Sequence, residues 1–250
     1  MKLAFSKPTS KDEQQELCTR FRSYGYDGLQ LKYDQYSKYI CAPERFIDDY
    51  GTDARDIASG LIIGGRLDEA GVTSLRSVFK FAQAVGTKRI IFCHGESRKG
   101  LSSSDLQSFA RALSELGKEA QQYEVVLSLH HHYDQPVMYR QDFSVFFEAI
   151  VDNTVKLTID TAHLVKSGID DIAGMIRDYR HIIDNIHVKD IKKGEFRVLG
   201  QGDIDFEPLF TALREIKYDG WLCADEESGS DLVGAMETCI RFLIPYVVCC

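Results

Sequence analysis

The feature that most constrains this 250-residue sequence is a regular alternation of short β-type runs with amphipathic helical patterns. Eight β-type runs recur along the chain, at residues 3–6, 28–32, 60–63, 89–94, 125–130, 155–160, 182–190 and 220–225. Helical patterns separate them; between residues 73 and 85, for example, apolar side chains recur at helical spacing. Strands that alternate with helices in this way form parallel sheets covered by helices.

The number of strand–helix units and the chain length together favour a closed barrel. Eight units in 250 residues match the (β/α)₈, or TIM, barrel, whereas an open doubly wound sheet rarely needs eight. Such a sheet would usually carry a Gly-rich phosphate loop after its first strand, and Lys7-Pro8-Thr9 is not one. Because no linker-like stretch divides the chain, the sequence predicts a single α/β domain over residues 1–250 with the (β/α)₈ fold.

Composition excludes several classes of protein. The net charge of −8 disfavours non-specific nucleic-acid binding, which needs Lys and Arg against phosphate. No apolar run reaches the ~18 residues of a membrane span, and residues 1–7 are too short for a secretion signal. The seven cysteines lack paired metal spacings, so we expect reduced, mostly buried thiols, with Cys249-Cys250 as a free tail. These features predict a cytoplasmic protein without nucleic-acid or membrane partners.

Polar side chains stand at the carboxyl ends of most predicted strands. In a parallel barrel these ends share one face, where the loops carry the chemistry. Because strand residues alternate in direction, residues two apart share a face. We therefore expect the following sets to point into the barrel: Gln30 with Lys32, Phe92 with His94, Ser128 with His130 and His132, Thr158 with Asp160, Asn185 with His187 and Lys189, and Cys223 with Asp225 and Glu227.

Four of these residues form a predicted metal site: His130, Asp160, His187 and Asp225. A mixed set of imidazole and carboxylate ligands suits a divalent ion such as Zn²⁺ or Mn²⁺ rather than Mg²⁺ or Ca²⁺, which prefer oxygen ligands. Any one of the four could instead cap a strand or bond to a loop. Four such residues on four different strands favour the metal site.

Motifs along the second half of the chain resemble a known superfamily. They are Asp160-Thr-Ala-His163, His187-Val-Lys-Asp190, Leu199-Gly-Gln-Gly-Asp-Ile-Asp-Phe206 and Tyr218-Asp-Gly-Trp-Leu-Cys-Ala-Asp225. In this order they resemble the xylose-isomerase-like TIM-barrel superfamily of sugar isomerases and epimerases, which includes an AP endonuclease. The resemblance implies one divalent metal held by Glu, Asp, His and Glu after strands five to eight. Asp160 and His187 match this pattern, whereas His130 and Asp225 replace the two glutamates.

The resemblance implies a metal-dependent isomerase or epimerase of a sugar, a sugar phosphate or a polyol. The metal would polarise a carbonyl group, and Asp225 or Glu227 would remove the neighbouring proton. Lys189 would bind a phosphate or an enediolate oxygen. Epimerisation needs a second base, for which His130 or His132 is the candidate. A dehydratase of the same superfamily would use the same proton removal and then lose a β-hydroxyl group.

Further residues are expected to contact the substrate. They are His94, His132, His163 and Lys189, although His163 could equally be the partner of a metal ligand. The backbones of residues 200–202 and 228–230 lie where such barrels often bind phosphate. Glycines that only make a turn would look the same, and we favour that interpretation for residues 200–202.

Two other functions and the oligomeric state remain open. An AP-endonuclease-type nuclease needs more metal ligands than the chain offers: residues 60–65 contain no His, and residues 195–198 lack the Asp-x-His expected there. A non-catalytic sugar-binding barrel would explain the two missing glutamates. Residues 242–248 are apolar, and Pro245 is expected to end the last helix. We expect this segment to pack on the barrel's own helices; if exposed, it would form a homodimer contact.

Overall fold

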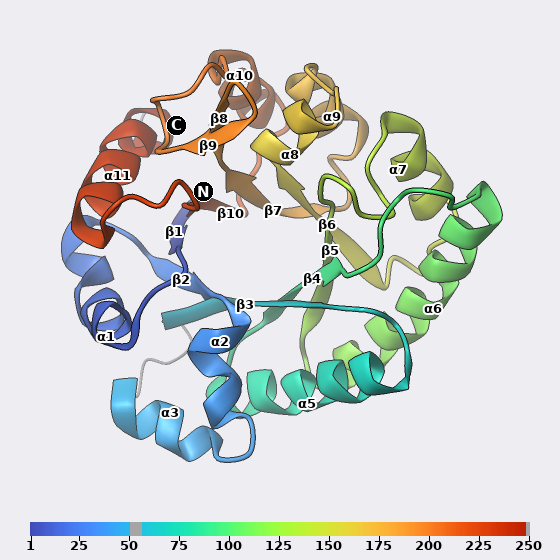
Figure 1. Cartoon of the computed structure of the whole chain (residues 1–250), viewed down its shortest axis with the longest axis horizontal. Helices are drawn as coiled ribbons and strands as arrows, with labels where there is room; N and C mark the ends of the chain where they lie inside the picture. The colour runs from blue at the N-terminus through green and yellow to red at the C-terminus, as the bar shows by residue number, and fades with distance from the viewer. Residues whose placement is uncertain (51–56, 249–250) are drawn as a thin grey trace.

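The computed structural model describes residues 1–50 and 57–248, so the predicted Cys249-Cys250 tail lies outside the described residues. Eight parallel strands close into a barrel in the order β1-β10-β7-β6-β5-β4-β3-β2. They are β1 (Lys2–Ser6), β2 (Gly28–Leu31), β3 (Ala58–Gly65), β4 (Arg89–His94), β5 (Val126–His130), β6 (Val155–Asp160), β7 (Ile183–Val188) and β10 (Trp221–Asp225). Figure 1 shows the strands in the centre and helices around them, which confirms the predicted (β/α)₈ barrel.

Helices follow the strands along the chain. They are α1 (Lys11–Arg20), η1 (Phe21–Tyr24), α2 (Tyr33–Tyr36), η2 (Ser37–Tyr39), α3 (Pro43–Tyr50), α5 (Glu69–Val85), α6 (Ser103–Gln122), α7 (Arg140–Phe147), α8 (Thr161–Lys166), α9 (Ile172–Asp178), α10 (Glu207–Glu215) and α11 (Leu232–Val248). Local sequence defines their ends: Ser10 caps α1 in a capping box with Glu13, and Asp68 caps α5, which ends at Gly86 with φ of 80°.

The seventh predicted run divides into two elements. Strand β7 ends at Val188, and β8 (Asp190–Lys192) then pairs with β9 (Glu195–Arg197) in an antiparallel hairpin. The two residues of its turn, Lys193 and Gly194, both have positive φ, as a type I′ turn requires. Figure 1 draws this hairpin between α8 and α11. It brings Phe196 to the polar face of the barrel.

The last helix continues through Pro245 to Val248, so the prediction that Pro245 ends it is wrong. A proline costs one helical hydrogen bond, and here only the final residues follow it. Aromatic packing holds this end in place: Tyr246 stacks on Phe210 of α10 with ring centroids 3.8 Å apart, and Phe242 contacts Phe206 at 5.3 Å. The segment therefore packs on the barrel's own helices, as we expected.

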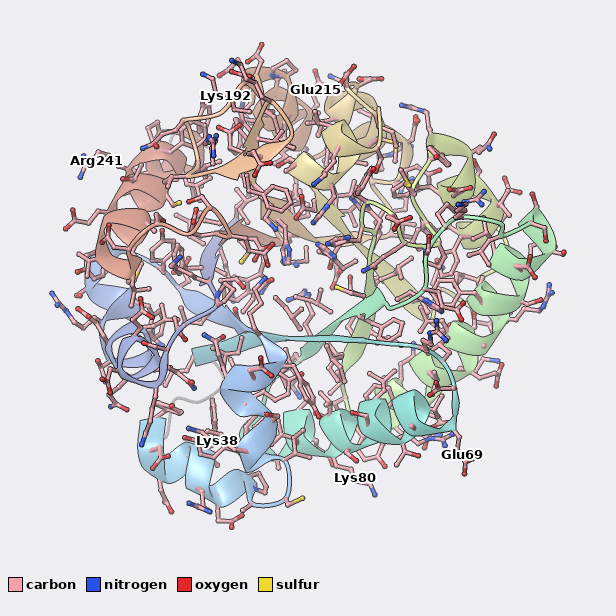
Figure 2. All side chains as sticks on the ribbon, viewed as in Figure 1. Lys38, Glu69, Lys80, Lys192, Glu215 and Arg241 are labelled. Carbon is pink, nitrogen blue, oxygen red and sulfur yellow. The ribbon has the colours of Figure 1, made fainter. Side chains whose placement is uncertain are left out.

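The core lies between the strands and the helices, whereas the inside of the barrel is largely polar. Leu157 and Ile159 are fully buried in the apolar layer, while Thr158 between them belongs to the polar interior. Charged side chains such as Lys80 and Glu215 project from the outer helices in Figure 2. The five cysteines in the described part of the chain are free thiols. Within those residues no helix has the length and apolar character needed to cross a bilayer.

Candidate metal centre and active site

Three adjacent strands bring three of the four predicted metal ligands together. His130, Asp160 and His187 are the final or near-final residues of β5, β6 and β7, and all three are buried. His130 Nε2 lies 3.5 Å from Asp160 Oδ2, and His187 Nδ1 lies 3.9 Å from the same oxygen. One potential ligand atom from each residue falls within 4.8 Å of the others.

These three atoms share a second property. His130 Nε2, Asp160 Oδ2 and His187 Nδ1 are all buried, and none has a hydrogen-bond partner. A buried polar atom without a partner loses free energy, on the order of 1–3 kcal/mol, so three converging on one point need an explanation. A divalent ion between them would satisfy all three. Two imidazole nitrogens and one carboxylate oxygen match the ligand preferences of Zn²⁺ and similar ions.

The fourth predicted ligand, Asp225, reaches the same region but is bound to lysines. Its Oδ2 lies 3.6 Å from His187 Nδ1 and accepts a hydrogen bond of 2.8 Å from Lys189 Nζ. Its Oδ1 accepts one of 2.7 Å from Lys32 Nζ. Both lysines also donate to Glu227, at 2.8 and 2.5 Å. Two ammonium groups and two carboxylates therefore form one closed network beside the three unpartnered atoms.

The network keeps all four of its groups charged. Burial opposes the charge of Asp225, but Lys189 and Lys32 hold the pKa of its carboxyl well below the usual range. Asp225 and burial raise the pKa of Glu227, yet the two lysines produce a net lowering. Burial likewise opposes the charge of Lys189 and Lys32, but the carboxylates raise the pKa of both ammonium groups. Asp225 is consequently a weak base.

Lys32 was absent from the site residues predicted from the sequence. It follows β2 directly and lies on the same side as Gln30, whose side chain hydrogen-bonds inside the barrel. The alternation had placed Gln30 and Lys32 on one inward face. Lys32 stands two residues after an inward-facing glutamine at the carboxyl end of a strand. This position is the sequence feature that could have identified it as a site residue.

His132 and His163 lie together on another side of the centre. Their ring centroids are 3.6 Å apart, and His163 Nδ1 accepts a hydrogen bond of 3.5 Å from the backbone N–H of Tyr133. The other nitrogen of His163, Nε2, is buried without a partner. Phe196 contacts the His163 ring at 5.4 Å and lies 4.5 Å from Lys189 Nζ. Burial lowers the pKa of both imidazoles, so both are neutral near pH 7.

His94 is not brought together with the other predicted substrate-binding residues. Its ring packs on Phe109 of α6, with centroids 4.3 Å apart, and its Nδ1 accepts a hydrogen bond from the N–H of Glu96. Cys93 points inward in its place, with Sγ 3.3 Å from His130 Nδ1. The expectation that His94 faces into the barrel is therefore wrong, because β4 turns its other set of side chains inward.

His131 supports Asp160 from outside the centre. Its Nε2 accepts a hydrogen bond of 2.9 Å from the backbone N–H of Asp160, and its ring packs against Phe143 at 5.0 Å. Burial lowers the pKa of His131 to about 3, and that of His130 to about 4. Both imidazoles are thus held neutral, so His131 can accept the Asp160 N–H and the unpartnered Nε2 of His130 can offer a lone pair.

The two loops considered for phosphate are filled by the chain's own carboxylates. Asp190 accepts hydrogen bonds from the backbone N–H groups of Gly200, Gly202 and Ile204. Glu226 Oε1 accepts three more from residues 228–230: the Ser228 N–H and the two serine hydroxyls. Residues 200–202 therefore make a structural turn, as we favoured, and neither loop leaves these donors free for a phosphate.

A comparison with known sequence families gives the same assignment as the fold and the motifs. The model of the family described as xylose isomerase-like TIM barrel matches residues 18–245. The chain belongs to this family. The resemblance inferred from the motifs is thereby confirmed.

The curated relatives with the most similar sequences include enzymes. An inosose dehydratase of Clostridium tetani is 30% identical over 165 residues, which cover 58% of this chain and 55% of that protein. An inosose dehydratase of Clostridium perfringens is 28% identical over 193 residues, covering 64% and 65%. The chain therefore spans less than two thirds of the length of either relative.

Solved structures share the xylose isomerase-like fold over nearly the whole chain. An L-ribulose 3-epimerase has a TM-score of 0.79 at 17% identity and covers 99% of this chain and 95% of its own. The IolI protein with a bound zinc atom has a TM-score of 0.78 at 18% identity, with 99% and 98% covered. At these identities the comparison supports the fold alone.

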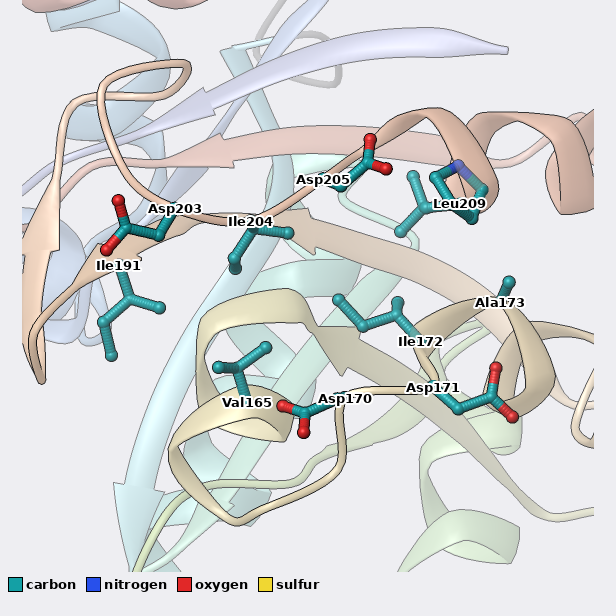
Figure 3. A pocket seen from close by; sticks show the side chains of 11 residues that line it. Val165, Asp170, Asp171, Ile172, Ala173, Ile191, Asp203, Ile204, Asp205 and Leu209 are labelled. Atoms are coloured by element: carbon teal, nitrogen blue, oxygen red, sulfur yellow. The ribbon is translucent and has the colours of Figure 1, made fainter.

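This member of the xylose isomerase-like family also has a cavity outside its barrel. About 380 Å³ in volume, it is lined by apolar side chains such as Val165 and Ile172, with carboxylates that include Asp203 and Asp205 (Figure 3). Asp203 pairs with Lys192 at 3.3 Å, and Asp205 accepts a hydrogen bond from the first turn of α10. The cavity contains none of the predicted site residues.

Proposed function

We propose that the protein is a metal-dependent dehydratase that acts on the ketone of a cyclic polyol. The observation that carries the proposal is the convergence of three buried, unpartnered ligand atoms next to the Lys189 ammonium, which lies 3.9 Å from Asp160 Oδ2. Carbonyl chemistry needs positive charge at the oxygen where negative charge develops. A metal ion and an ammonium group side by side meet this need.

His130, Asp160 and His187 would hold the metal, with Zn²⁺ or Mn²⁺ preferred over Mg²⁺ because two of the three ligands are imidazoles. The bound ion would supply Lewis acidity at the substrate's carbonyl oxygen. Three protein ligands leave coordination positions open, which is typical of catalytic rather than structural zinc sites. The bound zinc of the structurally similar IolI protein is consistent with this assignment.

The remaining groups have distinct proposed roles. Lys189 donates a hydrogen bond to the carbonyl oxygen as negative charge grows there, and Asp225 holds its ammonium in place. Glu227, whose side chain is 30% exposed, removes the proton beside the carbonyl. Lysines contact both oxygens of each carboxylate, but the Asp225 side chain is only 2% exposed, so the more accessible Glu227 is better placed for that task.

His163 is the proposed proton donor, with His132 packed against it. Because its Nδ1 accepts from the Tyr133 N–H, the proton of a neutral His163 resides on Nε2. This N–H passes its proton to the leaving β-hydroxyl group as the C–H and C–O bonds break and a C=C bond forms. Water departs, and the proton taken up by Glu227 returns to His163 Nε2, which restores both groups. Glu227 as a base and His163 as a separate acid suit elimination. Epimerisation would instead need a second base.

The substrate class is inferred from the relatives and from the filled loops. The curated relatives are named inosose dehydratases, and an inosose is a ketone of a cyclohexane polyol. Since Asp190 and Glu226 occupy the donors of both loops, we propose a substrate without a phosphate group. The isomerase or epimerase predicted from the sequence would share the first proton transfer and differ only in the fate of the resulting enediolate.

The test is to incubate chelator-treated protein with an inosose or with ketohexoses in D₂O, with and without Zn²⁺ or Mn²⁺. We expect metal-dependent formation of an unsaturated ketone from the inosose, measured by its ultraviolet absorbance. Deuterium exchange that yields an epimer without loss of water would instead establish an epimerase. Metal binding without exchange or loss of water in any of these substrates would overturn the proposed dehydratase.

A further inference from the structure

A column of hydrogen-bonded polar side chains runs down the inside of the barrel from His187. In order, its members are His187, Gln30, Asn185, Thr158, Ser128, Asp184 and Arg89. The interior of such barrels is ordinarily filled by branched apolar side chains. Buried polar groups cost free energy unless each has a hydrogen-bond partner, and here every member has one. A polar network in place of apolar packing suggests that it has a function.

The upper part of the column joins two amides to the candidate metal ligand. His187 Nε2 and Gln30 Oε1 are 2.8 Å apart. Gln30 Nε2 donates a hydrogen bond of 2.7 Å to Asn185 Oδ1, and Asn185 Nδ2 donates one of 3.2 Å back to Gln30 Oε1. The two amides therefore orient one another.

The lower part joins Asn185 to an ion pair at the amino-terminal end of the barrel. Asn185 Nδ2 donates to Thr158 Oγ1 at 3.4 Å, and the hydroxyls of Thr158 and Ser128 are 2.8 Å apart. Ser128 Oγ donates to Asp184 Oδ1 at 2.7 Å. The other Asp184 oxygen accepts a hydrogen bond of 2.7 Å from Arg89.

The number of protons on each side chain fixes which member of each hydrogen bond in the column is the donor. An ionised carboxylate beside an arginine only accepts, so Asp184 takes the single hydroxyl proton of Ser128. Ser128 must then accept the proton of Thr158, which leaves Thr158 able only to accept from Asn185.

The same count continues through the amides. Because the NH₂ group of Asn185 faces Thr158, its oxygen faces Gln30 and accepts from the Gln30 NH₂ group. The oxygen of Gln30 therefore faces His187, and only an Nε2–H donor can bond to it.

We propose that Gln30 is a positioning residue that holds neutral His187 with its proton on Nε2, and that the ionised Asp184 at the far end of the barrel sets this choice. The Nδ1 lone pair of His187 then points toward Asp160 and Asp225, 3.9 and 3.6 Å away. The inference rests on the proposed function in one respect: a metal ion needs that lone pair. With the opposite tautomer, Nδ1–H would donate to a carboxylate and could not bind a metal.

The experiment is long-range ¹H–¹⁵N correlation NMR of the histidine rings in chelator-treated protein, recorded at alkaline pH so that the rings are neutral. The spectrum distinguishes the two tautomers without metal, substrate or turnover. We expect wild-type His187 to carry its proton on Nε2. A proton on Nδ1 in the wild-type protein would overturn the proposal without need of any variant.

Variants separate Gln30 from the rest of the column. Gln30→Glu keeps an acceptor at this position and should preserve the Nε2–H tautomer, whereas Gln30→Met removes it and should give a mixture. Thr158→Val should also give a mixture, because the amides are then free to reverse. Ser114→Ala removes an equally buried hydroxyl outside the column, on α6, and should change nothing.

Zn²⁺ titration provides the second readout. Loss of the partner of a ligating histidine typically lowers metal affinity about 10–100-fold, so we expect such a loss for Gln30→Met and recovery in Gln30→Glu. A Gln30→Met protein that keeps a pure Nε2–H tautomer and wild-type affinity would overturn the proposal. A protein with the expected tautomers but without dehydratase activity would count against the proposed function alone.

Discussion

The ammonium of Lys32 donates a hydrogen bond of 2.7 Å to Asp225 Oδ1, although 193 positions separate the two residues in the chain. The barrel closes between β1 and β10, with β2 on the far side of β1, so it brings the ends of its second and last strands near one another. The pairing matters for chemistry because lysines contact both oxygens of Asp225, which the sequence predicts as a metal ligand and a base.

Replacing Lys32 by Met should reduce catalysis without removing the metal. Asp225 and Glu227 would each lose one of their two cationic partners, and the pKa of both carboxyls would rise. We expect kcat/KM for the dehydration to fall by about 10²-fold, as for loss of one preorganised charged group. Zn²⁺ affinity should stay within about threefold, since Lys32 contacts none of the three ligands that converge.

Steady-state kinetics and Zn²⁺ titration check this prediction. Lys192→Met is the matched control, because Lys192 pairs with Asp203 at the surface, away from the site. An unchanged kcat/KM for Lys32→Met would show that the network does not take part in turnover.

Metal affinity should respond very differently to the two aspartates. Asp160→Asn should lower Zn²⁺ affinity by about 100-fold or more, because Asp160 supplies a converging oxygen without another partner. Asp225→Asn should lower it by less than about tenfold, because lysines already occupy its carboxylate. Calorimetric titration measures both. Equal losses would establish Asp225 as a fourth ligand, as the sequence predicted.

The metal-free protein should lose stability between about pH 6.5 and pH 4. Burial lowers the pKa of His130 to about 4 and that of His131 to about 3, from an ordinary value of 6.5. The unfolded chain therefore binds protons in this range that the folded protein does not, so folding becomes less favourable as pH falls. The loss is on the order of 3 kcal/mol for each fully buried imidazole.

Urea unfolding of chelator-treated protein at several pH values measures this dependence. His131→Gln should flatten the curve, while replacement of the exposed His181 by Gln should leave it unchanged. A wild-type curve that is flat across the same range would show that these imidazoles titrate normally.

Tyr246→Ala should destabilise the protein by about 2 kcal/mol, through loss of apolar burial and of its stacking on Phe210. Ile244→Ala, at a side chain 43% exposed, should cost less than about 0.5 kcal/mol. Urea unfolding compares the two variants. If Ile244→Ala proves the more damaging and also changes the elution volume, the segment would be the homodimer contact that remained open.

Much of the barrel and of its candidate metal centre could be predicted from the chain itself. The alternation of strand and helix patterns depends on local spacing, and eight repeats admit few closed architectures. The same alternation brings His130, Asp160 and His187 together, because the carboxyl ends of neighbouring parallel strands meet on one face. These predictions required no knowledge of any distance.

Tertiary structure decided the rest, because it depended on which atoms meet across the barrel. Strand alternation allows either Cys93 or His94 to face inward, and packing of His94 on Phe109 chose the cysteine. From the sequence alone, residues 200–202 fit both a phosphate loop and a simple turn. Only the structure shows that Asp190 accepts the hydrogen bonds of two of their backbone N–H groups. The partners of Asp225 were equally hidden, since hydrogen bonds between β2, β7 and β10 arise from closure of the barrel and leave no local pattern in the sequence.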